Sequence, residues 1–152
     1  MGTTKIFASL VLFGSLASAA SGPQMSHIRN SELRLGSIQT GQTSESIIRE
    51  IGSPNEKKIT DEGIELYYPG LIVYVGKSGV YEMESTSEKM CTPAKLCPGM
   101  TLSAAKSIYG EPVVAERPHG TFLEYYAEGI SCWLQLAVVD NVIATIRVEC
   151  QP

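Results

Sequence analysis

Apolar residues recur at the spacing of an amphipathic helix in two short stretches of the chain. A threonine precedes each stretch, where its side-chain oxygen can accept hydrogen bonds from the free N–H groups of the first helical turn. A glycine and then a proline follow each stretch, and this combination ends a helix because proline cannot continue it. The bounding residues are Thr43, Gly52 and Pro54 in the first stretch, and Thr101, Gly110 and Pro112 in the second. The pattern predicts two short helices with the same start and stop signals.

The spacing between these signals is constant along the chain. Gly41 and Gly99, which begin the two patterns, are 58 residues apart, and the same distance separates the glycines and the prolines that end them. A fixed period of this length indicates an internal duplication. We therefore predict a first unit at residues 31–88 and a second unit at residues 89–152.

Each predicted helix is followed by three stretches in which apolar and polar residues alternate, which is the pattern of half-buried strands. Turns rich in glycine, aspartate and asparagine separate these stretches. The stretches are residues 64–68, 71–75 and 80–85 in the first unit, and residues 121–127, 130–138 and 142–150 in the second. The sequence thus predicts an α+β fold made of two tandem repeats, each a short helix packed on an antiparallel β-meander.

The order Gly-x-Thr, short helix, Gly-x-Pro and then a meander with paired tyrosines occurs in both units. The paired tyrosines are Tyr67 and Tyr68 in the first unit, and Tyr125 and Tyr126 in the second. This order resembles the BamE/SmpA-like unit, and the β-lactamase inhibitory protein is a tandem of two such units. The resemblance covers residues 33–150. It implies a protein that binds other proteins through its sheet face and loops.

Residues 1–19 have the features of a secretory signal peptide. Lys5 is the only charged residue, an apolar run follows from residue 6 to residue 16, and Ala17-Ser18-Ala19 form a cleavage site. The run is shorter than the roughly 20 residues that span a membrane. No cysteine stands directly after the cleavage site, where a lipid would be attached. We expect a periplasmic or secreted protein without a transmembrane segment or lipid anchor, in which residues 20–30 form a flexible lead-in.

Four cysteines follow the predicted cleavage site, namely Cys91, Cys97, Cys132 and Cys150. An even number of cysteines in an exported protein indicates disulfides, for which three pairings are possible. Cys132 and Cys150 share the apolar side of their strands, and a turn near Asn141 would place them opposite each other. The sequence therefore favours Cys132 with Cys150, which leaves Cys91 with Cys97. The cysteine spacings match no zinc pattern.

The same alternation places a second set of side chains on the side of the strands opposite the apolar set. Tyrosine and tryptophan dominate this set, and these residues often anchor binding sites. The set is Tyr67, Tyr74, Glu124, Tyr126 and Trp133. Two interpretations stay open: either a partner protein docks on these residues, or a helix or loop covers the rings and makes them part of a core.

The chain shows no sign of catalysis or of nucleic-acid binding. The formal net charge is −4 and no basic run occurs, which argues against a nucleic-acid partner. Neither His27 nor His119 has an evident nucleophile or metal partner, and no phosphate-binding loop or hydrolase motif occurs. We expect a non-enzymatic module that binds another protein and uses no cofactor or metal. The alternatives are an inhibitor or immunity protein that blocks an enzyme, and a small-ligand binder with a pocket between the two units.

Overall fold

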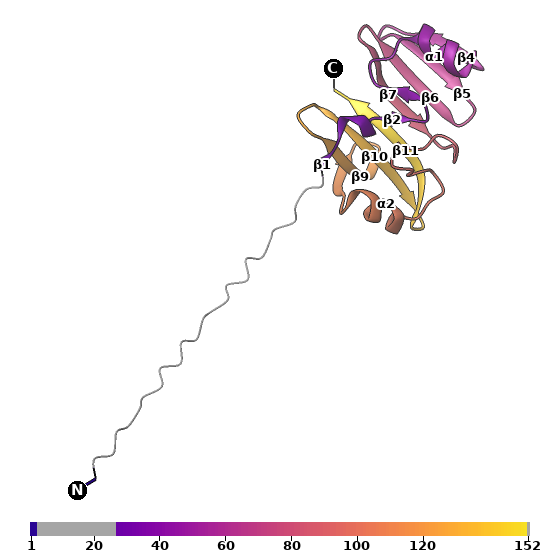
Figure 1. The fold of residues 1–152 in the computed structure, drawn as a ribbon. Helices are drawn as coiled ribbons and strands as arrows, with labels where there is room; N and C mark the ends of the chain where they lie inside the picture. The colour runs from indigo at the N-terminus through magenta and orange to yellow at the C-terminus, as the bar shows by residue number, and fades with distance from the viewer. Residues whose placement is uncertain (3–26, 152) are drawn as a thin grey trace.

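The computed structural model describes residues 1–2 and 27–151. Apart from its first two residues, the predicted signal peptide lies outside the described residues, as do residues 20–26 of the predicted lead-in. The described chain folds around one large sheet that carries two short helices (Figure 1). Within the described ranges, neither helix is long and apolar enough to cross a membrane.

The sheet contains nine strands and both parallel and antiparallel pairs. The strands are β1 (His27–Ile28), β4 (Glu56–Ile59), β5 (Ile64–Tyr68), β6 (Leu71–Gly76), β7 (Gly79–Ser85), β8 (Val113–Arg117), β9 (Gly120–Ala127), β10 (Cys132–Val139) and β11 (Val142–Cys150). They follow the order β1-β9-β10-β11-β7-β6-β5-β4, and β8 also pairs with β9. Only β1 and β9 run parallel. β4 therefore forms one edge of the sheet, and β8 and β1 share the other.

The two halves of the chain share this sheet because β7 and β11 lie side by side. Met83 faces Val148 and Ser85 faces Ile146 across this pair, and these side chains are fully buried. Pairing the two strands closes edges that separate units would leave exposed. The predicted fold class is therefore wrong, since one large mixed sheet dominates the fold in place of two tandem helix-plus-meander repeats. The boundaries predicted for the two units stay a prediction.

Both helices begin and end at the residues that the sequence indicated. They are α1 (Ser44–Ile51) and α2 (Leu102–Tyr109), each eight residues long. The side chains of Thr43 and Thr101 each accept a hydrogen bond from the backbone N–H three residues further on. Gly52 and Gly110 follow with φ angles of 90° and 85°, a region that favours glycine. Local capping chemistry therefore sets the helix ends.

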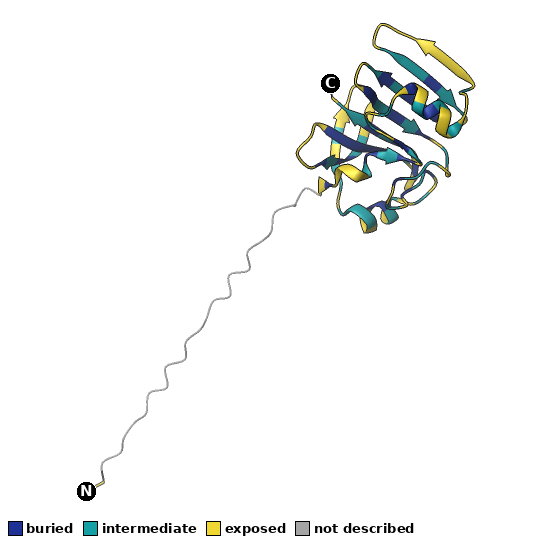
Figure 2. Cartoon of the chain, turned by 45° about the horizontal axis from the view of Figure 1, so that its top comes forward, coloured by how far each residue is buried: buried dark blue, intermediate teal, exposed yellow. Residues whose placement is uncertain are grey.

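A single core lies on one side of the sheet. It is covered by α1, by α2, and by a hairpin of β2 (Arg34–Leu35) and β3 (Ile38–Gln39) that follows a 3-10 turn, η1 (Asn30–Glu32). Buried residues, dark blue in Figure 2, run along the middle strands, whereas the edge strand β4 is exposed. The covering elements and loops contribute the buried side chains Leu33, Leu35, Ile38, Ile47, Leu96 and Ala105. These elements therefore pack on one side and leave the other side of the sheet uncovered by them.

Three strands of the large sheet, β1, β4 and β8, were absent from the sequence prediction. All four residues of β4 are exposed, so they carry no alternation of buried and exposed positions. β8 is exposed at Val114, Glu116 and Arg117 because it also lies at an edge. The lead-in was predicted to be flexible up to residue 30, but His27 and Ile28 form β1, and Ile28 is buried in the core.

The hairpin of β10 and β11 sets the register that joins Cys132 to Cys150. Asp140 and Asn141 have φ angles of 49° and 64°, as a tight two-residue hairpin turn requires. A β-bulge then shifts the register by one residue after Ala137. This shift places Cys132 directly opposite Cys150, with Cα atoms 4.0 Å apart, and the predicted disulfide is confirmed.

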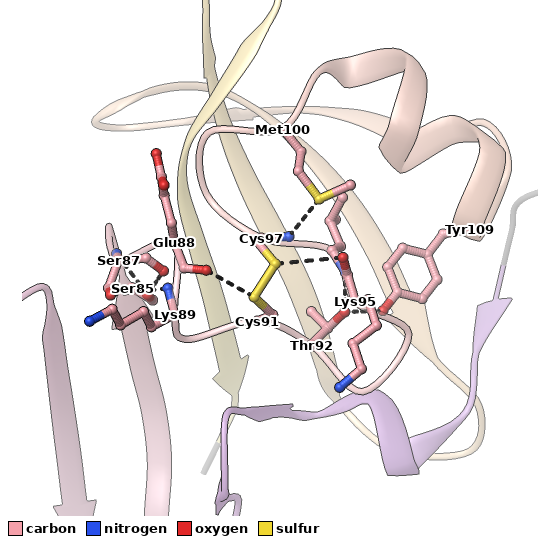
Figure 3. The surroundings of a disulfide bond; sticks show 11 residues. Ser85, Ser87, Glu88, Lys89, Cys91, Thr92, Lys95, Cys97, Met100 and Tyr109 are labelled. Carbon is pink, nitrogen blue, oxygen red and sulfur yellow. Dashed lines mark hydrogen bonds between the residues drawn. A yellow bond between two sulfur atoms is a disulfide. The ribbon is translucent and has the colours of Figure 1, made fainter.

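The second predicted disulfide, between Cys91 and Cys97, is also present (Figure 3). It closes a loop that packs against α2. In this loop the Thr92 Oγ1 lies 2.6 Å from the Tyr109 hydroxyl oxygen and accepts a hydrogen bond from the N–H of Leu96. The two disulfides support the prediction that the protein is exported, because thiols stay reduced in the cytoplasm.

Candidate functional site on the outer face of the sheet

We call the side of the sheet opposite the core the outer face, and its side chains form rows across the strands. Residues that face each other in neighbouring strands define each row. The central row is Tyr126, Trp133, Glu149, Glu82, Tyr74, Glu65 and Lys58. The second row is Glu124, Gln135, Arg147, Glu84, Ile72, Tyr67 and Glu56. All five residues that the sequence assigned to this side of the strands lie in these two rows.

Glu124 is the centre of a polar cluster at one end of the outer face, and its side chain is completely buried. Arg117, on β8, donates two hydrogen bonds to the carboxylate, with N–O distances of 2.9 and 2.7 Å. The Tyr126 hydroxyl donates a third at 2.5 Å, and the Gln135 Nε2 donates a fourth at 2.8 Å. We call these four residues the Glu124 cluster. Its bonds use both carboxylate oxygens and hold the side chains against one another.

The hydrogen bonds also keep Glu124 charged. Burial acts to raise the pKa of this carboxyl, but the bonds from Arg117, Tyr126 and Gln135 outweigh burial and hold the pKa below its ordinary value. A carboxylate that is charged and fully bonded is not poised to exchange a proton near neutral pH. The Glu124 cluster therefore supports the shape of the face rather than acid–base chemistry.

Replacing Glu124 with glutamine is expected to lower the free energy of unfolding at neutral pH by about 2–3 kcal/mol. The new amide keeps a single acceptor oxygen, and in either orientation its NH₂ group would face a donor nitrogen of Arg117, so at least one hydrogen bond of the cluster would be lost. Urea denaturation followed by circular dichroism measures the change. Glu116→Gln is the matched control, because Glu116 is exposed on the same edge strand as Arg117.

The contribution of Glu124 should depend on pH in a defined direction. Because its pKa is lower in the folded chain, this contribution is fully present above the ordinary value of 4.5 and is lost as pH falls through the folded value. The difference between wild type and Glu124→Gln should therefore stay constant down to about pH 5 and shrink below it. A difference that persists undiminished at about pH 3 would show that the charge of Glu124 does not stabilise the fold.

Trp133 lies on the outer face but is only 5% exposed. Its ring is 6.1 Å from the Tyr126 ring and 5.5 Å from the Arg117 guanidinium carbon. It does not belong to the core cluster. The ring is therefore buried beside side chains of its own face, an arrangement that neither interpretation of the sequence described. Its Nε1 has no hydrogen-bond partner among the residues that the structure describes.

Tyr67 and Tyr74 lie toward the other end of the outer face and are half-buried. The Tyr74 ring is 6.3 Å from the Tyr81 ring, and burial, followed by the charge of Glu82, raises the pKa of Tyr74 to about 12. Strands β7 and β11 separate Tyr67 and Tyr74 from the Glu124 cluster and from Trp133. The structure thus brings three of the predicted residues together and leaves the other two apart from them.

The residues between these two groups are charged, and the sequence prediction did not include them. They are Glu82 and Glu84 on β7 and Arg147 and Glu149 on β11. Arg147 donates hydrogen bonds to Glu84 and lies 3.4 Å from Glu82. Burial raises the pKa of Glu82, with Arg147 opposing the change and Glu149 adding to it. Their alternation with buried apolar residues was the signal in the sequence that would have placed them on this face.

A hollow of about 110 Å³ opens on the outer face beside the second row. Its lining is Glu84, Phe122, Gln135, Ala137, Thr145 and Arg147. A second hollow of about 230 Å³ lies where β1 approaches α2, and there Glu32 accepts a hydrogen bond from the Tyr109 hydroxyl at 2.5 Å. In the part of the chain that the structure describes, no group of three or more His, Cys, Asp or Glu side chains could hold a metal ion.

No family model matches the sequence, and no curated protein matches it. Solved structures with a similar fold include the following three. An extracellular protein containing an SCP domain from Bacillus anthracis matches with a TM-score of 0.52 and 12% identity, over 73% of this chain and 44% of that chain. A DUF4309 family protein from Bacillus subtilis matches with a TM-score of 0.51 and 15% identity, over 74% and 80%. A cysteine-rich secretory protein from Staphylococcus aureus matches with a TM-score of 0.53 and 10% identity, over 82% and 50%.

These similarities establish the fold and nothing further, because the identities are 10–15%. The chain matches only half or less of the length of the first and third proteins. None of these three is described as a BamE protein or as the β-lactamase inhibitory protein, so the resemblance to BamE/SmpA-like units stays a prediction.

Proposed function

We propose that this protein is an exported, non-enzymatic module that binds another protein through the outer face of its sheet. The supporting observation is a set of aromatic rings that lie on this face and outside the core cluster. They are Tyr67, Tyr74, Tyr126 and Trp133. The elements that cover the core pack on the opposite side, so a partner can approach these rings without displacing α1 or α2.

Tyr74 is the ring best placed to contact a partner. It is half-buried, stands in the central row, and has no place in the core cluster. Tyrosine suits such a position because its ring offers rigid apolar area and its hydroxyl can still bond to water or to the partner. Fully burying a large apolar side chain is worth about 1.5–3 kcal/mol. The proposal also places the protein in the periplasm or outside the cell. Cell fractionation would distinguish these two locations.

Tyr74→Ala is expected to weaken partner binding at least tenfold, which corresponds to about 1.4 kcal/mol. The partner is first captured from periplasmic or culture-medium extract on immobilised protein and identified by mass spectrometry. Its dissociation constant is then measured by calorimetry for wild type and for Tyr74→Ala. If the partner is an enzyme that loses activity in the complex, the protein is an inhibitor.

The control for this measurement is Ile59→Ala, which removes an apolar side chain that is 82% exposed on the edge strand β4. Both variants should give the circular dichroism spectrum of the wild type. Equal binding by Tyr74→Ala and wild type, together with a loss in Ile59→Ala, would move the binding site to the sheet edge and contradict the proposal.

A further inference from the structure

The middle of the outer face carries an excess of negative charge. Across β5, β7 and β11, the two rows contain four carboxylates and a single cationic side chain, and all of these are half-buried. The carboxylates are Glu65, Glu82, Glu84 and Glu149, and the cation is Arg147; a second cation, Lys58 on the edge strand β4, faces Glu65. A partner that meets this face must therefore offer positive charge or lose free energy by desolvating unpaired carboxylates.

Two of these carboxylates face each other directly. Glu149 stands opposite Glu82 in the pairing of β11 with β7, and like charges at facing positions destabilise a sheet. Arg147 directs its hydrogen bonds to Glu84 and reaches Glu82, and Glu149 has no ion-pair partner among the described side chains. Local arrangements that disfavour folding are expected at functional sites, where a bound partner can compensate for them.

The hollow beside the second row points independently to a donor group. Gln135 is only 3% exposed and lines this hollow. Its amide N–H₂ must face Glu124, because a carboxylate only accepts hydrogen bonds, and so its amide oxygen faces away from Glu124. This oxygen receives no hydrogen bond from any described residue. The hydroxyl of Thr145 and the carboxylate of Glu84 are further acceptors on the same lining, and Arg147, which also lines the hollow, donates its hydrogen bonds to Glu84.

The size of the hollow selects a side chain over a free ligand. Its volume of about 110 Å³ is well below the 300–1,000 Å³ typical of small-molecule sites. Phe122 and Ala137 supply an apolar part of the lining that suits a methylene chain. Because Glu84 already pairs with Arg147, a long aliphatic chain that ends in a cationic hydrogen-bond donor fits the apolar lining and the Gln135 amide oxygen.

From these observations we infer that the partner presents a basic segment to the outer face, with one lysine or arginine side chain in the hollow and another between Glu82 and Glu149. This inference rests on the proposed function, because it names the chemistry of the protein partner. Tyr74 lies next to Glu82 in the central row, where its half-buried ring can flank the bound cation.

A capped nonapeptide of alternating lysine and alanine is the probe, titrated into ¹⁵N-labelled protein at low salt and followed by NMR. The expected result is a set of shift changes at the Glu82 and Glu149 amides and at the Trp133 indole N–H. The protein has a single tryptophan, so that indole signal is unambiguous. A matched peptide of glutamate and alanine should cause none of these changes.

Matched variants separate a specific site from general attraction between opposite charges. The double change Glu82→Gln with Glu149→Gln is expected to weaken binding of the lysine peptide at least tenfold. The control, Glu45→Gln with Glu128→Gln, alters net charge equally at exposed positions away from the face and should change affinity less than twofold. Ala137→Leu, which fills the hollow, should also weaken binding.

Three results would overturn the inference: no binding of the lysine peptide, shift changes confined to other surfaces, or equal losses in the two double variants. The captured partner distinguishes this failure from failure of the proposed function. A partner that is lost with Tyr74→Ala but retained in full by the Glu82 and Glu149 double variant refutes the basic segment and leaves the docking face intact. A partner retained by both variants refutes the docking face itself.

Discussion

Trp133→Ala is expected to lower the free energy of unfolding by about 3–4 kcal/mol, as typical for the loss of a buried aromatic ring. The indole is 5% exposed although it lies on the outer face. Removing it would leave a cavity beside the Tyr126 ring and under the Arg117 guanidinium, and these groups pack against it in the wild type. Urea denaturation followed by circular dichroism measures the loss, since the variant has no tryptophan fluorescence.

Trp133→Phe is the matched control for this prediction. Phenylalanine keeps an aromatic ring next to Tyr126 and removes an Nε1 that has no partner among the described residues, so it should cost less than half as much as alanine. If Trp133→Ala lowers the free energy of unfolding by less than about 1 kcal/mol, the outer face relaxes around the gap and does not need the indole for its shape. With the expected loss, Trp133→Ala cannot test partner binding, and Tyr74→Ala takes that role.

The ends of the helices could be predicted because each depends on a few neighbouring residues. Thr43 and Thr101 cap the N–H three residues further on, and this geometry needs no distant contact. The Asp140 and Asn141 turn is local in the same sense. These predictions succeeded because the decisive atoms lie within about one turn of the chain.

The arrangement of the strands could not be predicted because it depends on contacts between distant residues. Met83 and Val148 are both apolar positions of alternating strands, but nothing near either of them selects the other as its partner. The edge strands were missed for a different reason. Strand β4 is exposed at every residue, so it lacks the periodicity that reveals a strand in a sequence.

The outer face shows the same division between local and distant information. Alternation was enough to place Tyr74, Glu124 and Trp133 on one side of the strands. It could not show that Glu124 is fully buried, because that burial depends on Arg117, which belongs to the unpredicted strand β8. The prediction selected aromatic residues, which lie toward both ends of the face, and it omitted Glu82 and Glu149 between them. That pair is conspicuous only once β7 and β11 are known to be neighbours.

Replacing both Cys132 and Cys150 with alanine is expected to lower the free energy of unfolding by about 3 kcal/mol. The disulfide closes a loop over a sequence separation of 18, against 6 for Cys91 and Cys97. A cross-link stabilises mainly by restricting the unfolded chain, and this effect grows with the logarithm of the loop length. The shorter loop should therefore contribute about 2 kcal/mol. Alanine is preferred to serine because Cys132 is 8% exposed and a hydroxyl there would need a partner.

The Cys132→Ala/Cys150→Ala variant is compared with a Cys91→Ala/Cys97→Ala variant. The free energy of unfolding of each is measured in urea under non-reducing conditions. The order of the losses is the decisive result, because each variant removes one disulfide and the two disulfides differ in loop length and position. A larger loss for the Cys91 and Cys97 variant would mean that its disulfide acts chiefly in the native state. It would do so by holding Leu96, which is fully buried, and Thr92, which lies against Tyr109. In that case the loop, rather than the β10–β11 hairpin, would anchor α2 to the sheet.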